Sequence, residues 1–193
     1  MIADLIAANR SCRRFDEYHS VDLRTLEQLV NLARLSASGA NLQPLKFILS
    51  CRPALNAEIF SCLGWAAYLK DWPGPEPGER PAAYIVILGD SQISKDFGVD
   101  HGIAAQSILL GARDRGLAGC MLGSVNRKVL RTVLDVPEHL GILLVVAIGK
   151  PVEEVVIETA GPDGNIRYWR DERAVHHVPK RPLSEIIVAS HGV

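Results

Sequence analysis

The chain has 193 residues and a formal net charge of -1, with 48% hydrophobic and 22% charged residues. This near-neutral charge excludes a general attraction to nucleic acid or to an anionic membrane surface, and no apolar run approaches the ~20 residues of a membrane-spanning helix. The length favours a single domain over residues 1–193, with a core that needs no disulfide or structural metal. The four cysteines are scattered and the N-terminus lacks a signal-peptide pattern, so we expect reduced thiols in a cytoplasmic protein.

The first half of the chain predicts three helices around one strand. Apolar residues at helical spacing predict helices over residues 2–8, 22–35 and 53–62, and residues 45–51 predict a strand. Residues 36–44 are small and polar without periodicity, so they predict a loop.

Residues 71–78 form the densest proline and glycine stretch of the chain. Too little chain precedes them for a domain linker, so we interpret them as a mobile surface loop or lid. The aromatic residues Trp65, Tyr68 and Trp72 stand beside this stretch. Core packing is the ordinary role of such residues, and contact with a substrate beneath the lid is the alternative.

The second half of the chain supplies the predicted core. Residues 83–88 form a nearly continuous apolar run, which is typical of a central strand that is buried on both faces. A helix from Asp96 or Asp100 to about Arg115 has apolar or small residues around most of its circumference, so we expect it to be buried all round, partly by a second subunit. The remaining predicted elements are strands within 116–124 and over 142–148, a helix from Asn126 to Leu134, a hairpin of 152–158 with 166–169, and a C-terminal helix from Pro182. This order predicts an α+β fold, in which helices flank a central mixed β-sheet.

Several common catalytic motifs are absent from the sequence. It contains no Gly-x-Ser-x-Gly elbow, no Gly-x-x-x-x-Gly-Lys-Ser/Thr loop and no Gly-x-Gly-x-x-Gly after a strand. His176 and His177 would point to opposite faces of a strand and could not readily share an ion, so we expect no metal site. Cys12 stands beside Arg10 and Arg13, which would lower its pKa, but no other pattern supports a reactive thiol.

The strongest functional signal is Arg10-Ser11-Cys12-Arg13-Arg14-Phe15. Guanidinium groups donate paired hydrogen bonds in a geometry that matches a phosphate, and they stay charged. An exposed basic loop is the simpler interpretation of this stretch alone. Lys180-Arg181 adds a second basic cluster and residues 38–43 add a small polar loop, so we favour a phosphate-bearing cofactor. Because the cofactor site offers no acid–base residues, an organic redox cofactor that does its own chemistry fits best.

Taken together, these segments resemble the FMN-dependent nitroreductase family. The similar segments, in family order, are residues 10–15, 37–44, 80–86, 100–106, 116–123 and 180–187. The chain departs from the family pattern at Gly39 and Ala40, where a hydroxyl is frequent, and at Met121, where an aromatic residue is frequent. The resemblance implies a nitroreductase-like fold, built as an intertwined homodimer with two FMN molecules at the interface.

The resemblance also implies a set of flavin-binding residues and no catalytic protein residue. Arg10, Ser11 and Arg13 would meet the phosphate, the ribityl chain and the pyrimidine edge. Lys180 and Arg181 would add positive charge at the phosphate. The backbone along the isoalloxazine ring would come from Leu122 and Gly123. A loop of the other subunit would reach the same flavin with Ser38, Gly39, Ala40, Asn41 and Gln43.

The function that the resemblance implies is that of an FMN-dependent NAD(P)H oxidoreductase. NADH or NADPH would pass hydride to flavin N5 and leave, and an electron-poor nitroaromatic, quinone or flavin would then be reduced in a ping-pong cycle. Two alternatives stay open at this point. One is a specialised flavin dehydrogenase or dehalogenase of the same fold, and the other is a flavin-binding protein for storage or sensing that does not turn over.

Overall fold

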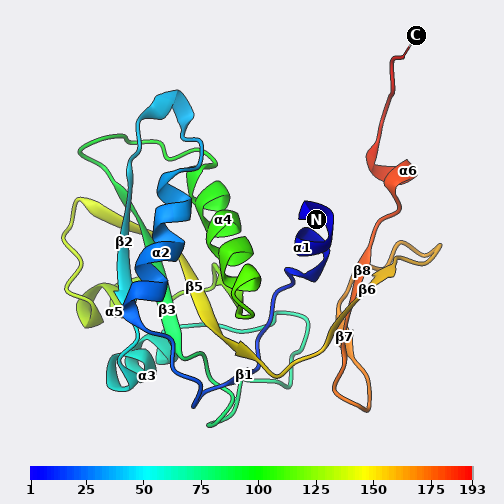
Figure 1. Ribbon diagram of the computed structural model, residues 1–193, viewed down its shortest axis with the longest axis horizontal. Coiled ribbons are helices and arrows are strands. Elements are labelled where there is room, and N and C mark those ends of the chain that lie inside the picture. The colour runs from blue at the N-terminus through cyan, green and yellow to red at the C-terminus, as the bar shows by residue number, and fades with distance from the viewer. Residues whose placement is uncertain (193) are drawn as a thin grey trace.

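The computed structural model describes residues 1–192, and strand β3 (Ala83–Asp90) is the centre of its main sheet (Figure 1). Every residue of β3 is buried, as its apolar sequence predicts. β3 pairs antiparallel with β2 (Leu45–Ser50) on one side and with β5 (Leu140–Pro151) on the other. The far side of β5 pairs antiparallel with β4 (Ala118–Leu122) and β1 (Phe15–Asp16). Ser11 adds a parallel bridge to Gly119 of β4, so both pairing directions occur at this sheet.

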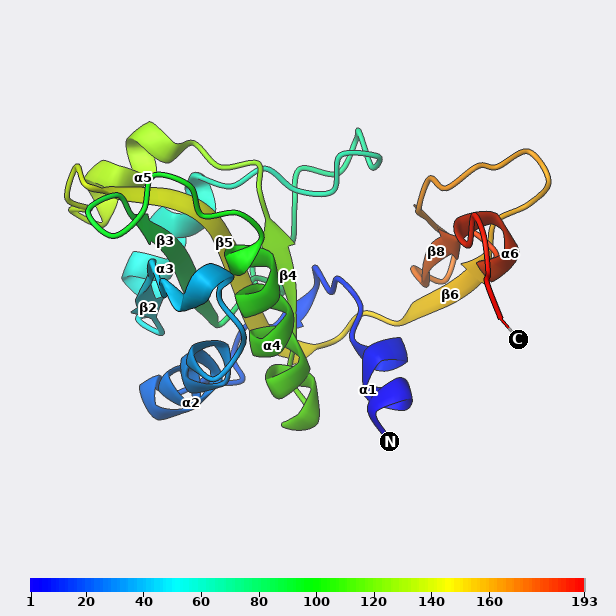
Figure 2. The same cartoon turned by 90° about the horizontal axis from the view of Figure 1, so that it is seen from above.

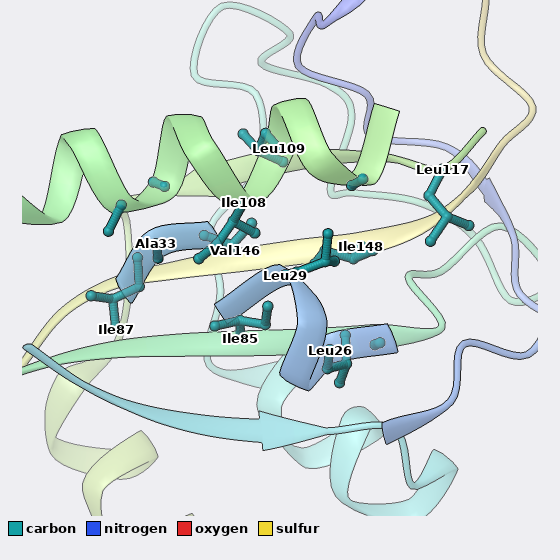
Figure 3. Packing of buried hydrophobic residues seen from close by; sticks show 14 of the residues in the cluster. Leu26, Leu29, Ala33, Ile85, Ile87, Ile108, Leu109, Leu117, Val146 and Ile148 are labelled. Carbon is teal, nitrogen blue, oxygen red and sulfur yellow. The ribbon is translucent and has the colours of Figure 1, made fainter. Parts of the chain in front are cut away.

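Helices cover both faces of the sheet, which explains why its central strands are apolar on both sides. α2 (Leu23–Arg34) and α4 (Asp100–Asp114) pack on the face that receives Ile85 and Ile87 (Figure 3). α3 (Pro53–Ser61) and α5 (Arg127–Val133) contribute to the cluster on the opposite face, which receives Tyr84, Val86 and Leu88. Successive strand side chains point to opposite faces, so residues 83–88 of β3 alternate between these two clusters. The predicted α+β fold is confirmed.

Two of the predicted helices, α2 and α5, begin directly after a residue whose side chain caps the helix. The Asp22 carboxylate accepts a hydrogen bond from the Thr25 N–H at 2.7 Å, and the Asn126 side chain accepts one from the Val129 N–H at 3.3 Å. Such caps satisfy N–H groups that have no partner within the helix. α4 begins at Asp100 and not at Asp96.

The small residues of α4 are explained in part by packing within the chain. Gly111 lies against α2, where an added Cβ would overlap the side chain of Leu32. The helix is therefore covered on one side by the main sheet and on another by α2. This packing accounts for part of the all-round burial that the sequence predicts for α4.

Residues 152–192 form an arm that projects beyond the main sheet (Figure 1, Figure 2). Its strands are β6 (Val155–Thr159), β7 (Trp169–Arg170) and β8 (His176–Lys180), and the short helix α6 (Leu183–Ile186) follows. β8 lies between the other two strands, parallel to β6 and antiparallel to β7. The predicted hairpin of 152–158 with 166–169 is therefore wrong. The partner of both segments is β8, whose polar sequence His-His-Val-Pro-Lys gives a weak strand signal.

Two further segments complete the fold. α1 (Ile2–Ala8) is the predicted N-terminal helix, and η1 (Gly39–Asn41) is one 3-10 turn inside the predicted loop 36–44. Residues 71–78 contain neither helix nor strand, in agreement with the predicted surface loop. Within residues 1–192, no helix combines the length and the apolar character that crossing a bilayer requires.

Candidate functional site

We call residues 10–14 the arginine loop. A cavity of about 370 Å³ lies where this loop, α4, β4 and the arm meet. We call it the inner cavity. Arg10, Ser11 and Arg13 line it from the arginine loop, and Lys180 lines it from the end of β8. The tertiary fold thus brings the two basic clusters of the sequence to one place. The other side chains that the argument below uses are Gln106 of α4, Met121 of β4, and Tyr168 and His176 of the arm.

The arginine loop is attached to the main sheet through β4. The Cys12 N–H donates to the Gly119 carbonyl at 2.9 Å. Gly119 is needed at this point because an added Cβ would overlap the Ala147 carbonyl and the Leu109 side chain. This close approach holds the backbone of the loop against the sheet and leaves the flanking arginine side chains at the cavity.

Cys12 itself is buried, and its pKa is shifted in the direction opposite to the one that the sequence predicted. Burial raises the pKa of the Cys12 thiol to about 12, and the nearby Glu153 carboxylate adds to the rise. The adjacent arginines do not overcome these effects, since desolvation disfavours the thiolate. The prediction of a lowered pKa was wrong, and Cys12 is a structural residue of the loop.

Glu153 is the residue that fixes the orientation of the loop. Its carboxylate accepts hydrogen bonds from the Arg13 N–H at 2.8 Å and from Arg170 Nη2 at 2.6 Å, and its side chain is fully buried. The Arg170 guanidinium also lies 4.3 Å from the centre of the Trp72 ring. Glu153 therefore connects the arginine loop with strand β7 and, through Arg170, with the edge of the predicted lid.

The three arginines of the loop have different surroundings. Arg14 Nε and Nη2 donate to the Glu79 carboxylate at 2.7 and 2.5 Å, and this pair raises the pKa of Arg14 while it lowers the pKa of Glu79. Arg10 Nη2 donates to the Ile6 carbonyl at 3.0 Å. The Nε atoms of Arg10 and Arg13 are buried without a hydrogen-bond partner among residues 1–192. Arg14 is satisfied by Glu79, whereas neither Arg10 nor Arg13 forms a side-chain ion pair with a carboxylate of residues 1–192.

His176 is a neutral neighbour of Arg13 at neutral pH. Its Nε2 lies 3.4 Å from Arg13 Nη1, and its ring centre lies 5.2 Å from that of Tyr168. Burial is the main cause that lowers the pKa of His176 to about 4; the Glu153 carboxylate opposes this shift, and the charges of Arg13 and Arg170 contribute to it. The neighbouring His177 has different partners, because its Nδ1 lies 2.5 Å from Glu158 and its ring stacks on Trp169. The two rings diverge, as expected for consecutive strand residues.

Loop 38–43 has a strained backbone that Asp100 holds in place. Ala40, Asn41 and Gln43 have φ values of 48°, 56° and 53°, a region that side-chain-bearing residues rarely adopt. The Asp100 carboxylate accepts from Ser38 Oγ at 2.6 Å and from the Gly39 N–H at 2.9 Å. Backbone strain of this kind persists only where the surroundings determine it strongly, and it is frequent at binding sites.

The single chain does not bring this loop to the inner cavity. Ser38 and Gln43 line a cavity of about 160 Å³ beside the first turn of α4, and Gly39 and Ala40 line another beside it. Gln106 and Leu109, which line the inner cavity, are farther along the same helix. The predicted flavin-binding residues therefore form two separate groups in one chain.

The other predicted site residues lie in varied surroundings. Leu122 is buried in the core, while Met121 beside it faces the inner cavity, and Gly123 is exposed after the end of β4. Arg181 is paired with Glu185 of α6. Among the aromatic candidates, Trp65 is buried against Phe60 with ring centres 5.6 Å apart, Trp72 is half-buried beneath Arg170, and Tyr68 is exposed beside Tyr168.

Sequence reasoning missed four residues that organise the site: Asp100, Glu153, Tyr168 and His176. Asp100 was interpreted as a helix start alone, and His176 as the polar end of a strand. Glu153 and Tyr168 stand in no recognisable motif, because their partners are distant in the sequence. The pairing of β1 with the end of β5 places Glu153 beside the arginine loop, and the pairing of β8 with β6 and β7 arranges the strands that carry His176 and follow Tyr168.

Comparison with known proteins identifies the family. The model of the nitroreductase family matches residues 6–150, which include the arginine loop, loop 38–43 and the main sheet except for Pro151 at the end of β5. The chain belongs to the nitroreductase family. Confirmation of the family also confirms the resemblance seen in the sequence.

Nitroreductase relatives are similar over most of their length. A protein of Archaeoglobus fulgidus named NADH dehydrogenase/NAD(P)H nitroreductase is 28% identical over 158 residues, which cover 78% of this chain and 85% of that protein. The structure titled FMN-dependent nitroreductase from Clostridium difficile R20291 is 24% identical with a TM-score of 0.65, and the match covers 84% and 92% of the two chains. A nitroreductase family protein from Streptococcus pneumoniae TIGR4 is 15% identical with a TM-score of 0.70, over 98% and 100% of the chains. These two structures share the fold of this chain, and the match to the second one extends over the arm.

Proposed function

We propose that this member of the nitroreductase family is an FMN-dependent NAD(P)H oxidoreductase that reduces electron-poor acceptors such as nitroaromatics, quinones or flavins. The observation that carries the proposal is the inner cavity. Arg10, Arg13 and Lys180 line it, and no carboxylate is among its described lining residues. Two buried guanidinium nitrogens at this cavity have no partner among residues 1–192. Burying donors of this kind is costly unless a ligand accepts their hydrogen bonds, and a phosphate or a flavin pyrimidine edge supplies such acceptors.

The residues of the inner cavity fit FMN. Arg10 and Lys180 would hold the phosphate, and Arg13 would donate to the polar edge of the ring system. When bound, FMN would supply the redox chemistry by accepting hydride from NAD(P)H and passing the electrons to the acceptor. Support for these partners comes from two relatives: the Clostridium difficile structure is named an FMN-dependent nitroreductase, and the Archaeoglobus fulgidus protein is named an NAD(P)H nitroreductase.

The contribution of the protein is binding and fixed charge. Glu153 orients the backbone of Arg13, and His176 packs beside the Arg13 guanidinium without adding charge of its own at neutral pH. The fixed guanidinium would stabilise negative charge that develops on a bound group, with no reorganisation of the site. Titrating FMN into Arg13→Ala tests this role directly.

We also propose that the protein is a homodimer in which loop 38–43 of one subunit completes the inner cavity of the other. The strained loop and the basic cavity are separate in one chain, so neither is a complete flavin site. The arm and α1 also expose many large apolar side chains, among them Ile2, Ile6, Ile157, Leu183, Ile186 and Ile187. Their exposure is unfavourable by about 25 cal/mol per Å² of apolar surface, and a second copy would cover them.

Two measurements test the proposed function. The purified protein should release FMN on denaturation, and anaerobic NADH or NADPH should bleach the flavin absorbance. A protein that takes up no added FMN contradicts the proposal, and an unchanged oxidised spectrum with both nicotinamides indicates a flavin-binding protein without turnover. Light scattering should give twice the chain mass of 21.0 kDa at micromolar concentration, and a mass of one chain would contradict the dimer. The cytoplasmic location expected from the sequence stays a prediction.

A further inference from the structure

A second cavity, of about 500 Å³, lies between residues 67–70, which precede the predicted lid, and residues 165–169 of the arm. We call it the outer cavity. Tyr68 and Lys70 line it from the segment that leads into the lid, and Arg167, Tyr168 and Trp169 line it from the arm. Aromatic faces and cations are thus its main lining groups, and none of its described lining residues is acidic. Neither the predicted flavin site nor the core of the fold accounts for this composition.

Tyr168 is the wall that the outer and inner cavities share. On the inner side, the Arg13 guanidinium lies 5.1 Å from the centre of the Tyr168 ring, and the His176 ring centre lies 5.2 Å from it. On the outer side, the Tyr68 ring centre lies 4.9 Å away, and the Tyr68 N–H is 3.3 Å from the Tyr168 hydroxyl oxygen. A ligand in the outer cavity would therefore be one aromatic ring away from the groups of the inner cavity.

The cations of the outer cavity are available for a ligand. Lys70 and Arg167 are exposed, and neither forms an ion pair with a carboxylate of residues 1–192. The Arg167 guanidinium lies 5.8 Å from the centre of the Tyr68 ring, which places its charge over the aromatic lining. Trp169 stacks on His177 with ring centres 4.1 Å apart, so its indole is held in a fixed orientation although the side chain is 46% exposed.

We propose that the outer cavity binds a planar aromatic group that carries an anionic substituent, and that Lys70 and Arg167 select for the anion. Tyr68, Tyr168 and Trp169 offer ring faces on which a planar group can stack, and the two cations attract a carboxylate or phosphate beside it. This inference rests on the proposed oxidoreductase function and specifies its substrate class. The anion has two chemical sources, an anionic acceptor or the adenosine phosphates of NAD(P)H, and the experiment separates them.

The experiment compares two probes that share a ring and differ in charge, 4-nitrobenzoate and 4-nitrobenzamide. The test variant is Lys70→Gln with Arg167→Gln, and Arg24→Gln with Lys128→Gln removes the same charge from exposed positions on α2 and α5. Binding to the oxidised holoprotein is followed by quenching of tryptophan fluorescence, which requires no turnover. Steady-state kcat/KM is then measured for each acceptor, and for NADPH and NADH with the neutral acceptor.

We expect the test variant to weaken 4-nitrobenzoate binding about 3- to 20-fold relative to the control variant, because the probe carboxylate loses its exposed ion pairs with Lys70 and Arg167. Binding of 4-nitrobenzamide should change less than about 2-fold, and Lys70→Arg with Arg167→Lys should restore the preference for the anion. If the nicotinamide supplies the anion, the selective loss appears in kcat/KM for NADPH and NADH. Either result supports the inference. Equal effects of the test and control variants on both probes and both nicotinamides would overturn it.

The proposed function and this inference fail in different ways. Failure of NADH and NADPH to bleach the wild-type flavin contradicts the proposed function, whatever the variants do. Normal bleaching in wild type contradicts the outer-cavity inference alone if neither probe binding nor kcat/KM for the two nicotinamides depends on the charges of Lys70 and Arg167.

Discussion

Replacement of Glu153 by alanine should destabilise the protein more than any other single change near the inner cavity. The substitution removes the acceptor of two donors, the Arg13 N–H at 2.8 Å and Arg170 Nη2 at 2.6 Å. Breaking a buried ion pair costs about 3–5 kcal/mol, because the remaining charge is buried without a partner. The Arg170 side chain is 16% exposed and regains some hydration, so we expect the lower part of this range, about 3 kcal/mol.

The assay is thermal unfolding of the flavin-free protein at constant protein concentration. For a domain of this size, 1 kcal/mol corresponds to roughly 2–4 °C in Tm, so Glu153→Ala should lower Tm by roughly 6–12 °C. Glu153→Gln keeps one carbonyl acceptor and should lose about half as much.

Glu154→Ala is the matched control, since the neighbouring Glu154 side chain is exposed and its backbone carbonyl is unchanged. The control should shift Tm by less than about 2 °C, as for most surface substitutions. A Glu153→Ala protein with the same Tm as the Glu154→Ala control would refute the assignment of Glu153 as the residue that connects the arginine loop to the arm.

Three further predictions concern charge and reactivity. Arg13→Ala should weaken FMN binding about 10- to 100-fold, from the loss of a charge-assisted hydrogen bond, and Arg13→Lys should recover only part; an unchanged FMN titration would remove Arg13 from the site. Glu158 is the main cause of a raised pKa of His177, so this pair stabilises the fold below the ordinary pKa of 6.5 and loses that effect as pH rises through the raised value. His177→Gln should therefore lower Tm at about pH 5.5 and change it little at about pH 9, and the opposite pH dependence contradicts the assignment. Cys12 should resist iodoacetamide at about pH 8 because its pKa is near 12, while the half-buried Cys51 reacts first; peptide mapping that finds Cys12 alkylated first would contradict its burial.

Local sequence was sufficient for the features that depend on neighbouring residues. The central strand β3, the capped helices α2 and α5 and the loop at 71–78 follow from apolar periodicity, from Asp22 and Asn126 as caps, and from proline and glycine content. The arginine stretch and the ordered family segments were sufficient for the family as well. These features can be predicted from the sequence because each depends on residues within a few positions of one another.

Tertiary structure alone decided how the polar groups are used. The charge pattern alone does not distinguish Arg14 from Arg13, and of these two the family resemblance named only Arg13 for the flavin. The structure shows a physical difference, since Glu79 satisfies Arg14 while Arg13 lines the inner cavity. Burial and Glu153 reversed the expected pKa shift of Cys12.

The arm was decided by pairing between distant segments. β8 lies between β6 and β7 and displaces the hairpin that the local turn residues predicted. The same pairing places Tyr168, His176 and Lys180 beside the arginine loop. The sequence by itself determined the central strand, the capped helices and the family, because those depend on local order. Only the tertiary structure decided which charge meets which partner, since contact, desolvation and electrostatic attraction depend on distance in space and not along the chain.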